Sequence, residues 1–115
     1  MRLAWYVYIL ECEPNALYTG STPDPDHRLR QHLSRVAGGA KFTRSHPPKA
    51  LAALWRTPDA HTAHSLEWHI KRLTPAKKRA LVAAPDAVSE MLGDFAEGAE
   101  PLDSAPYRHH FTDLS

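Results

Sequence analysis

The chain has 115 residues, 43% of them hydrophobic, and a formal net charge of +1. This length suits one domain with a single modest core. No apolar run approaches the roughly 20 residues that a membrane span needs, and the N-terminus lacks the pattern of a signal peptide, so we expect no membrane partner. The single cysteine, Cys12, cannot form an internal disulfide, which favours a reducing cytoplasm. We interpret Cys12 as a small buried hydrophobe rather than a nucleophile.

The net charge conceals an uneven distribution of charge along the chain. Residues 27–79 carry twelve lysines and arginines against two acids, whereas residues 84–115 carry one base against seven acids. A basic stretch of this density favours a polyanionic partner such as a nucleic acid. The alternative is an ordinary solvated surface with separated charges, and charge alone does not decide between the two.

The N-terminal part of the chain is typical of a β-hairpin. Residues 4–12 are rich in aromatic and β-branched types and predict a strand. Residues 13–15, Glu-Pro-Asn, are a turn signal. Residues 16–19 then predict a short second strand that ends at Gly20.

A helix and a third strand are expected next. The apolar spacing predicts a helix over residues 25–36, with Asp24 as its N-cap and a proline at its first position. The glycine pair at 38–39 should stop this helix. We expect a basic loop over residues 40–49 and a strand over residues 50–55.

The second half of the chain predicts helices followed by an acidic extension. Two helices are expected, over residues 60–73 and 75–84. We therefore place one domain at residues 1–84 and a C-terminal extension at residues 85–115. The extension should hold one short helix over residues 86–96 and then a tail that is extended or loosely docked.

Three tyrosines provide the first candidate for a functional site. Tyr6 and Tyr8 lie two residues apart and share one face of the first strand. Tyr18 lies on the partner strand of the hairpin and can stand opposite Tyr8. Taken alone, such a pattern more often reflects cross-strand aromatic packing than a catalytic pair.

Two helices carry the other candidates. Arg28 and His32 are spaced i, i+4, so their side chains stack on one flank of the first helix. Glu67 is the only acid between residues 60 and 84, and it lies beside the apolar stripe of its helix. A carboxylate near a core face needs a partner, which is either a salt bridge to Lys71 or a hard divalent cation.

The order of these residues resembles the GIY-YIG nuclease superfamily, and in particular its short stand-alone bacterial branch. The resemblance covers about residues 5–83. It rests on a series of short motifs in the correct order: Tyr6-Val7-Tyr8, Tyr18-Thr19-Gly20, Arg28 with His32, residues 39–44, Glu67-Trp68-His69-Ile70-Lys71, and Lys77-Lys78.

The resemblance implies a fold and a catalytic site. The fold would be α/β (α+β), with a three-stranded antiparallel sheet flanked by helices. The activity would be hydrolysis of a nucleic-acid phosphodiester, with DNA favoured over RNA, by a site that binds one Mg²⁺ or Mn²⁺. Glu67 would be the metal ligand, and the full catalytic set would be Tyr8, Tyr18, Arg28, His32 and Glu67.

Further basic residues are expected to contact the substrate. Contacts to phosphates position a nucleic acid but do not specify its sequence. The side chains that we assign to this role are Arg30, Arg35, Lys41, Arg44, Lys71, Lys77 and Lys78.

The resemblance also implies how the site would act. Arg28 would neutralise charge that develops on the phosphate. A tyrosine of ordinary pKa is a poor base at neutral pH, so either its pKa is lowered by nearby cations or it orients the attacking water. We favour Tyr8 for this role, assisted by Tyr18 and His32.

The sequence departs from the family pattern at several points, and other functions compete. Tyr6 replaces the leading glycine, and His27 stands where a second arginine is common. One alternative is a non-catalytic nucleic-acid-binding module of the same fold. Another is a protein-interaction domain that uses the apolar side chains of the extension: Val88, Met91, Leu92 and Phe95. The histidines at 61, 64, 69, 109 and 110 lack the frame of a zinc site and are interpreted as surface residues.

Overall fold

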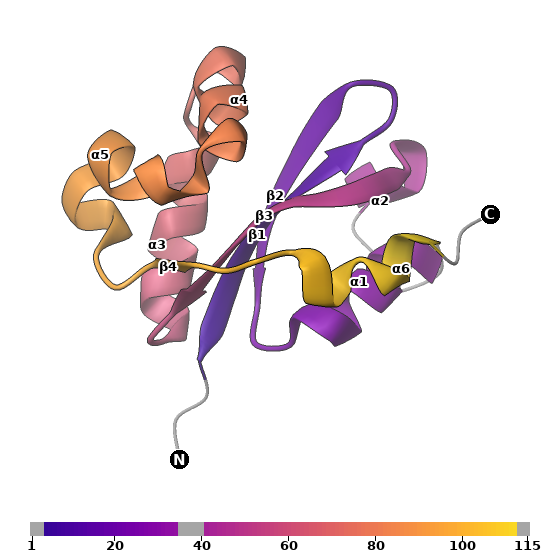
Figure 1. Cartoon of the computed structure of the whole chain (residues 1–115), viewed down its shortest axis with the longest axis horizontal. Helices are drawn as coiled ribbons and strands as arrows, with labels where there is room; N and C mark the ends of the chain where they lie inside the picture. Colours follow the sequence, from indigo (N-terminus) through magenta and orange to yellow (C-terminus); the bar gives the residue numbers. More distant parts are fainter. Residues whose placement is uncertain (1–3, 35–40, 113–115) are drawn as a thin grey trace.

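The structure is a computed structural model that describes residues 4–34 and 41–112. A sheet lies at the centre, with α3, α4 and α5 on one side of it and α1 and α6 on the other (Figure 1). The strands and helices follow one another as β1 (Trp5–Cys12), β2 (Ala16–Thr22), α1 (Pro25–Ser34), α2 (Lys41–Ser45), β3 (Pro48–Thr57), α3 (Ala60–Lys71), α4 (Pro75–Ala83), η1 (Pro85–Ala87), α5 (Val88–Leu92), η2 (Gly93–Ala96), β4 (Glu100–Pro101), η3 (Ala105–Tyr107) and α6 (His109–Thr112).

The sheet is antiparallel, with strand order β2-β1-β3-β4. The predicted hairpin of β1 and β2 is confirmed, but its register sets Tyr8 opposite Gly20 and Tyr18 opposite Leu10, so Tyr18 does not stand opposite Tyr8 as expected. The sheet has four strands rather than the three that we predicted. The additional strand, β4, has two residues and lies in the segment that was expected to be an extended or loosely docked tail, where no periodic pattern marks a strand.

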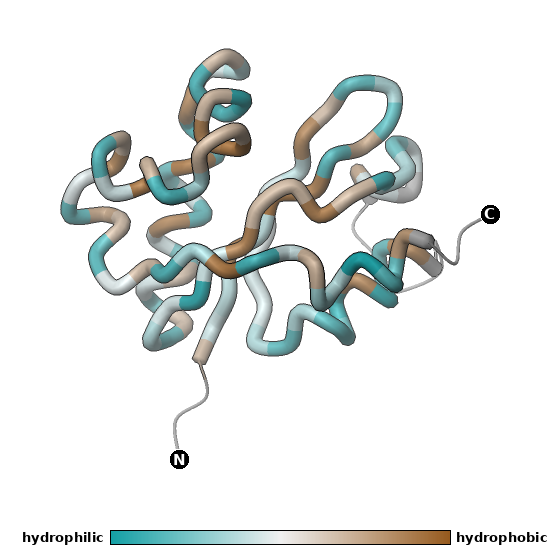
Figure 2. Tube along the Cα trace, viewed as in Figure 1, coloured by the Kyte–Doolittle hydropathy of each residue, from teal (hydrophilic) through white to brown (hydrophobic). Residues whose placement is uncertain are grey.

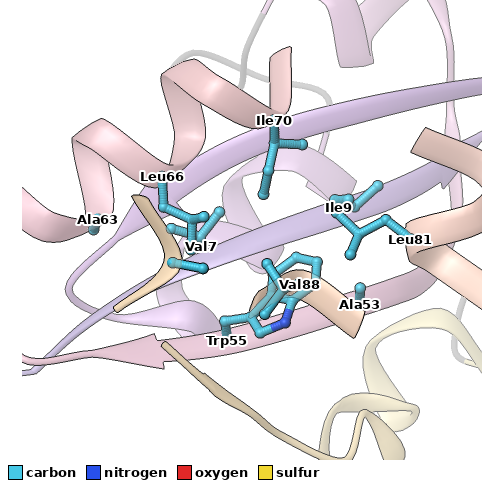
Figure 3. Packing of buried hydrophobic residues seen from close by; sticks show 10 residues of the cluster. Val7, Ile9, Ala53, Trp55, Ala63, Leu66, Ile70, Leu81 and Val88 are labelled. Atoms are coloured by element: carbon cyan, nitrogen blue, oxygen red, sulfur yellow. The ribbon is translucent and has the colours of Figure 1, made fainter. Parts of the chain in front are cut away.

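Alternation along β1 divides the apolar residues between two cores. Val7 and Ile9 face α3 and join Leu66 and Ile70 of that helix in the first core. Figure 3 shows these side chains packed with Trp55 of β3. The second core lies on the opposite face of the sheet. It contains residues of β1, α1 and β3, namely Tyr8, Leu10, Cys12, Leu29, Leu51 and Leu54.

Cys12 is completely buried, and burial raises the pKa of its thiol to about 11. The thiolate that a nucleophile requires is therefore disfavoured, in agreement with its interpretation as a small apolar residue.

Hydropathy follows the same layering: the strands at the centre are the more hydrophobic, and α1 is mostly hydrophilic (Figure 2).

Capping residues position the helices that carry the candidate site. Asp24 accepts a hydrogen bond from the backbone N–H of His27 at 3.1 Å, which confirms it as the cap of α1. Asp59 accepts one from the N–H of Thr62 at 2.8 Å and starts α3. These side chains satisfy backbone donors that have no partner inside the helix.

The loop expected over residues 40–49 is wrong in part. It contains the five-residue helix α2, and β3 begins within it at Pro48. A helix of little more than one turn has no repeating apolar stripe for sequence patterns to detect. The predicted helix stop at residues 38–39 lies outside the described residues.

The C-terminal extension packs along the sheet rather than trailing from it. Val88 and Ala96 belong to the first core, and the backbone N–H of Leu102 donates to the carbonyl of Leu54 at 2.8 Å. Beyond β4, the tail that was predicted to be extended or loosely docked is docked: it forms η3 and α6, and α6 contacts α1. A domain division at residue 84 remains a prediction. Among the described residues, no helix combines the length and the apolar character that crossing a membrane requires.

Candidate active site

Strand β2 forms the frame of the candidate site because it is the edge strand next to β1. Gly20 and Ser21 are neighbours on β2, so they face opposite sides of the sheet. Gly20 lies against Tyr8 on the face of α1, and Ser21 hydrogen-bonds Glu67 of α3. The candidate residues therefore surround one edge of the sheet from both faces.

A buried chain of polar side chains lies on the α1 face. The Tyr8 hydroxyl is 2.8 Å from Nε2 of His32, and Nδ1 of His32 is 2.8 Å from Oγ1 of Thr43. His32 and Thr43 are completely buried, and Tyr8 nearly so. Arg28 also hydrogen-bonds the Tyr8 side chain, and a guanidinium can only donate. In the His32 tautomer that carries its proton on Nδ1, Nε2 accepts from the Tyr8 hydroxyl and the Nδ1–H donates to Thr43.

Burial governs the protonation of this chain. It raises the pKa of Tyr8, and the neighbouring Tyr18 raises it further, although the hydrogen bond and positive charge of Arg28 act in the opposite direction. Burial, followed by the charge of Arg28, lowers the pKa of His32 from its usual 6.5 to about 4. Tyr8 is therefore a neutral phenol beside a neutral imidazole, and the protein groups around it raise the tyrosine pKa rather than lower it as we considered from sequence.

Tyr18 lies beside this chain in an aromatic cluster. Its ring centroid is 6.3 Å from that of Tyr8 and 5.3 Å from that of His32. It also stacks on Phe42 of α2 at 5.7 Å. The tyrosines therefore take part in aromatic packing, and the candidate residues gather at the same place. The two interpretations from sequence do not exclude each other.

Glu67 reaches the β2 edge from α3, and both of its carboxylate oxygens have partners. Oε1 accepts a hydrogen bond from the Ser21 hydroxyl at 2.5 Å, and Oε2 is 2.7 Å from Nζ of Lys71. The Glu67 side chain is 19% exposed and that of Lys71 is 49% exposed. The salt bridge considered from sequence exists, and the carboxylate remains accessible at the rim of the sheet.

The donor set at Glu67 suits a hard divalent cation. Mg²⁺ binds through one or two carboxylates and completes its coordination with water and phosphate oxygens. The Lys71 ammonium lies 2.7 Å from Oε2, so a positive charge is already accommodated at this oxygen. Ser21 fixes the other oxygen and orients the group. The residues present therefore fit one cation with few protein ligands.

Residues on the two faces of the sheet interact across β2. The Lys71 ammonium, paired with Glu67, lies 6.0 Å from the centroid of the Tyr18 ring on the other face. The negative charge of Glu67 also contributes to the raised pKa of Tyr8. Arg28, which interacts with Tyr8, is held by a 2.9 Å hydrogen bond to Gln31 one turn along α1. The predicted residues therefore lie around one edge, although α1 and α3 cover opposite faces of the sheet.

The remaining basic residues are not all gathered here. Lys71 belongs to the site, and Arg30 is exposed on α1. Lys77 and Lys78 lie on α4, the helix that contributes Leu81 to the core on the α3 face. Arg35 lies outside the described residues, and so do the side chains of Lys41 and Arg44.

Several residues that contact the candidate set were not identified from sequence: Gly20 as a contact of Tyr8, Ser21, Gln31 and Thr43. Short polar residues such as Ser21 and Thr43 carry no spacing signal, and their partners are 46 and 11 positions away. Gln31 stands three positions after Arg28, a spacing at which helix side chains meet. That spacing could have identified Gln31, and Gly20 and Thr43 lie within motifs that carried the family resemblance although no role was assigned to them.

Comparison with known proteins assigns this arrangement to a class. The profile of the GIY-YIG catalytic domain matches residues 4–80, so the chain belongs to the GIY-YIG family and has its nuclease-type fold. The chain is 44% identical over 78 residues to the UPF0213 protein BH0048 of Halalkalibacterium halodurans, covering 68% of this chain and 81% of that protein. It is 41% identical over 85 residues to the UPF0213 protein DP2720 of Desulfotalea psychrophila, covering 74% and 76%.

A solved structure is also similar to this chain. The solution NMR structure of the UPF0213 protein BH0048 from Bacillus halodurans has 39% sequence identity, a TM-score of 0.46, and coverage of 78% of this chain and 97% of that one. The sequence relatives place the chain in the small stand-alone bacterial branch that its motifs had indicated.

Gly20→Ala should distort the site because a Cβ at this position would lie 2.6 Å from Cζ of Tyr8. Overpacking of this kind costs about 1–3 kcal/mol of folding free energy, measurable by urea unfolding. The double variant Gly20→Ala/Tyr8→Phe lacks the hydroxyl that is nearest to the new methyl group, so its loss should be smaller than the sum of the two single losses. Additive losses would show that Gly20 does not constrain Tyr8.

The low pKa of His32 should make folding stability depend on pH. The unfolded state takes up a proton near pH 6.5, and the folded state does so only near pH 4. Stability is therefore complete above pH 6.5 and falls as pH drops toward 4, by up to about 1.4 kcal/mol per pH unit. Urea unfolding of the wild type and of His32→Gln should show a steeper loss in the wild type. An NMR titration with His32 protonating near pH 6.5 would contradict this prediction.

Proposed function

We propose that this protein is a metal-dependent endonuclease that hydrolyses a nucleic-acid phosphodiester, with DNA favoured over RNA. The observation that carries the proposal is the meeting of Tyr8, Arg28 and His32 with Glu67 around the exposed edge of β2. Membership of the GIY-YIG family supports it. A core that served only stability would not need a buried tyrosine hydrogen-bonded to histidine and arginine, because apolar side chains fill such a space without the cost of burying polar groups.

Glu67 is the proposed ligand of one Mg²⁺ or Mn²⁺, oriented by the hydrogen bond from Ser21. When bound, the ion supplies Lewis acidity at the scissile phosphate and at the leaving oxygen. Lys71, which forms an ion pair with Glu67, would then pair with a phosphate oxygen. Before substrate binds, the positive charge of Lys71 is thus balanced by the negative charge of Glu67.

Arg28 and Tyr8 are proposed to act on the reacting groups directly. The Arg28 guanidinium neutralises negative charge that develops on the phosphate, for which its planar fork of donors is well suited. Tyr8 orients the attacking water through its hydroxyl. Proton transfer from water to the Tyr8 oxygen requires that the phenol proton move on to Nε2 of His32, 2.8 Å away. Tyr18 completes the wall of the site.

Substrate binding is proposed to rest on phosphate contacts around the β2 edge. Arg30 and Lys71 are exposed near the residues of the site, and basic side chains contact phosphates regardless of base sequence. The single free cysteine is in keeping with action in the cytoplasm. The competing proposal is a non-catalytic module that keeps the fold and binds nucleic acid without cleaving it.

Glu67→Gln should abolish Mg²⁺-dependent cleavage because an amide replaces the carboxylate that holds the cation. The loss should be ~10²-fold or more in rate, while binding of a labelled oligonucleotide stays within a few-fold of the wild type. Glu90→Gln, which changes an exposed acid of α5, is the matched control and should cleave normally. Absence of cleavage by the wild type on single-stranded, duplex and branched substrates would favour the non-catalytic module.

Tyr8→Phe removes only the hydroxyl that orients the water and contacts His32. Its turnover should fall by roughly 10²-fold or more under single-turnover conditions. Tyr107→Phe is the matched control, since Tyr107 packs on the same apolar cluster but has no place in the proposed mechanism. Undiminished turnover of Tyr8→Phe would transfer the role to Tyr18.

A further inference from the structure

A second cluster of ligand-type side chains lies where the C-terminal extension meets α1. The donor atoms of Asp26, His109 and His110 all lie within 4.8 Å of one another. Nε2 of His110 is 2.7 Å from Oδ1 of Asp26. The rings of His109 and His110 have centroids 4.1 Å apart, with 37° between their planes. The two imidazoles are neighbours in the sequence, and the carboxylate that they meet lies more than 80 residues before them.

The packing of the extension holds these groups in place. Tyr107 and Phe111, on either side of the histidine pair, pack against the core on the α1 face. The His110 side chain is only 8% exposed, whereas that of Asp26 is 50% exposed. One ligand is thus fixed by burial, and the cluster remains open to ions from solvent. Preorganised donors lose little freedom when they bind.

The surroundings of the cluster are electronegative. The pKa of Tyr107 is raised by burial first and then by the charges of Asp26 and Asp24 and by the neighbouring Tyr6. A field that disfavours a phenolate favours a cation at the same place.

We propose that Asp26, His109 and His110 bind a transition-metal ion of the Zn²⁺ type. Two imidazole nitrogens with one carboxylate oxygen suit Zn²⁺ and Co²⁺, whereas Mg²⁺ takes oxygen ligands. Ligands about 2.0–2.1 Å from a tetrahedral Zn²⁺ stand roughly 3.3 Å from one another. The 2.7 Å contact and the 4.8 Å limit lie on either side of this separation, so small side-chain movements suffice. Water takes the fourth position.

The ion would clamp the extension to the helix that carries Arg28. His109 and His110 belong to α6, and Asp26 precedes Arg28 by two positions in α1. Because the ion binds the folded arrangement and not the separated segments, it should raise the midpoint of thermal unfolding. This role does not depend on nuclease activity, so the failure of either proposal leaves the other intact.

The test is a Co²⁺ titration of the full chain followed by visible absorption, with Zn²⁺ competition and excess Mg²⁺ present to occupy oxygen sites such as Glu67. We expect one equivalent to bind with the intense bands of tetrahedral Co²⁺, and Zn²⁺ to displace it. His109→Ala and Asp26→Asn should each weaken binding by ~10-fold or more. The Asp26 side chain is 50% exposed and His109 is exposed, so the fold should persist in both variants. Circular dichroism checks this.

The matched control is His61→Ala, which removes an exposed histidine from α3. It should bind Co²⁺ as the wild type does. Zn²⁺ should raise the midpoint of thermal unfolding of the wild type and of His61→Ala, but not that of His109→Ala or Asp26→Asn. Wild-type affinity in His109→Ala or in Asp26→Asn overturns the proposal. So does a wild-type protein that binds neither Co²⁺ nor Zn²⁺ at millimolar concentration, or an equal loss of binding in His61→Ala.

Discussion

The pairing of β1 with β2 is the constraint on which the candidate site depends. Its register places Gly20 against the Tyr8 ring and turns the adjacent Ser21 to the other face, toward Glu67. A shift of one residue would exchange these directions, because side chains alternate along a strand. The buried side chains of both faces hold the register, so the stability of the two cores and the geometry of the site are parts of one arrangement.

Burial has opposite consequences at the two halves of the site. On the α1 face it keeps Tyr8 and His32 neutral, and their hydrogen bonds with Thr43 satisfy polar groups that would otherwise be costly. On the α3 face, Glu67 stays partly exposed and charged, with Lys71 as its partner. The arrangement thus combines a neutral, shielded side with a charged side that is open to solvent, and this combination is the basis of the hydrolysis that we propose.

Sequence reasoning recovered the elements with strong periodic or turn signals and the residues that those elements carry. The hairpin, α1 and α3 followed from residues 4–19, from Asp24 with the helix behind it, and from the apolar stripe near Glu67. What could not be predicted was that α1 and α3 cover opposite faces, because a stripe shows which side of a helix is buried but not against what. The two-residue β4 and the short α6 lack any period, so the convergence of Asp26 with the histidine pair was equally hidden.

The two margins of the sheet are treated differently. The outer side of β3 is covered at Trp55 and Arg56 by β4, whereas among the described strands none pairs with the outer side of β2. Unpaired backbone groups on an edge are a template for self-association and aggregation. Covering β2 in the same way would close the space beside Glu67 and Tyr18. Among the described residues, the protein therefore leaves its unpaired margin on the side of the sheet where we propose that the nucleic acid approaches, with the charged side chains of Glu67 and Lys71 beside it.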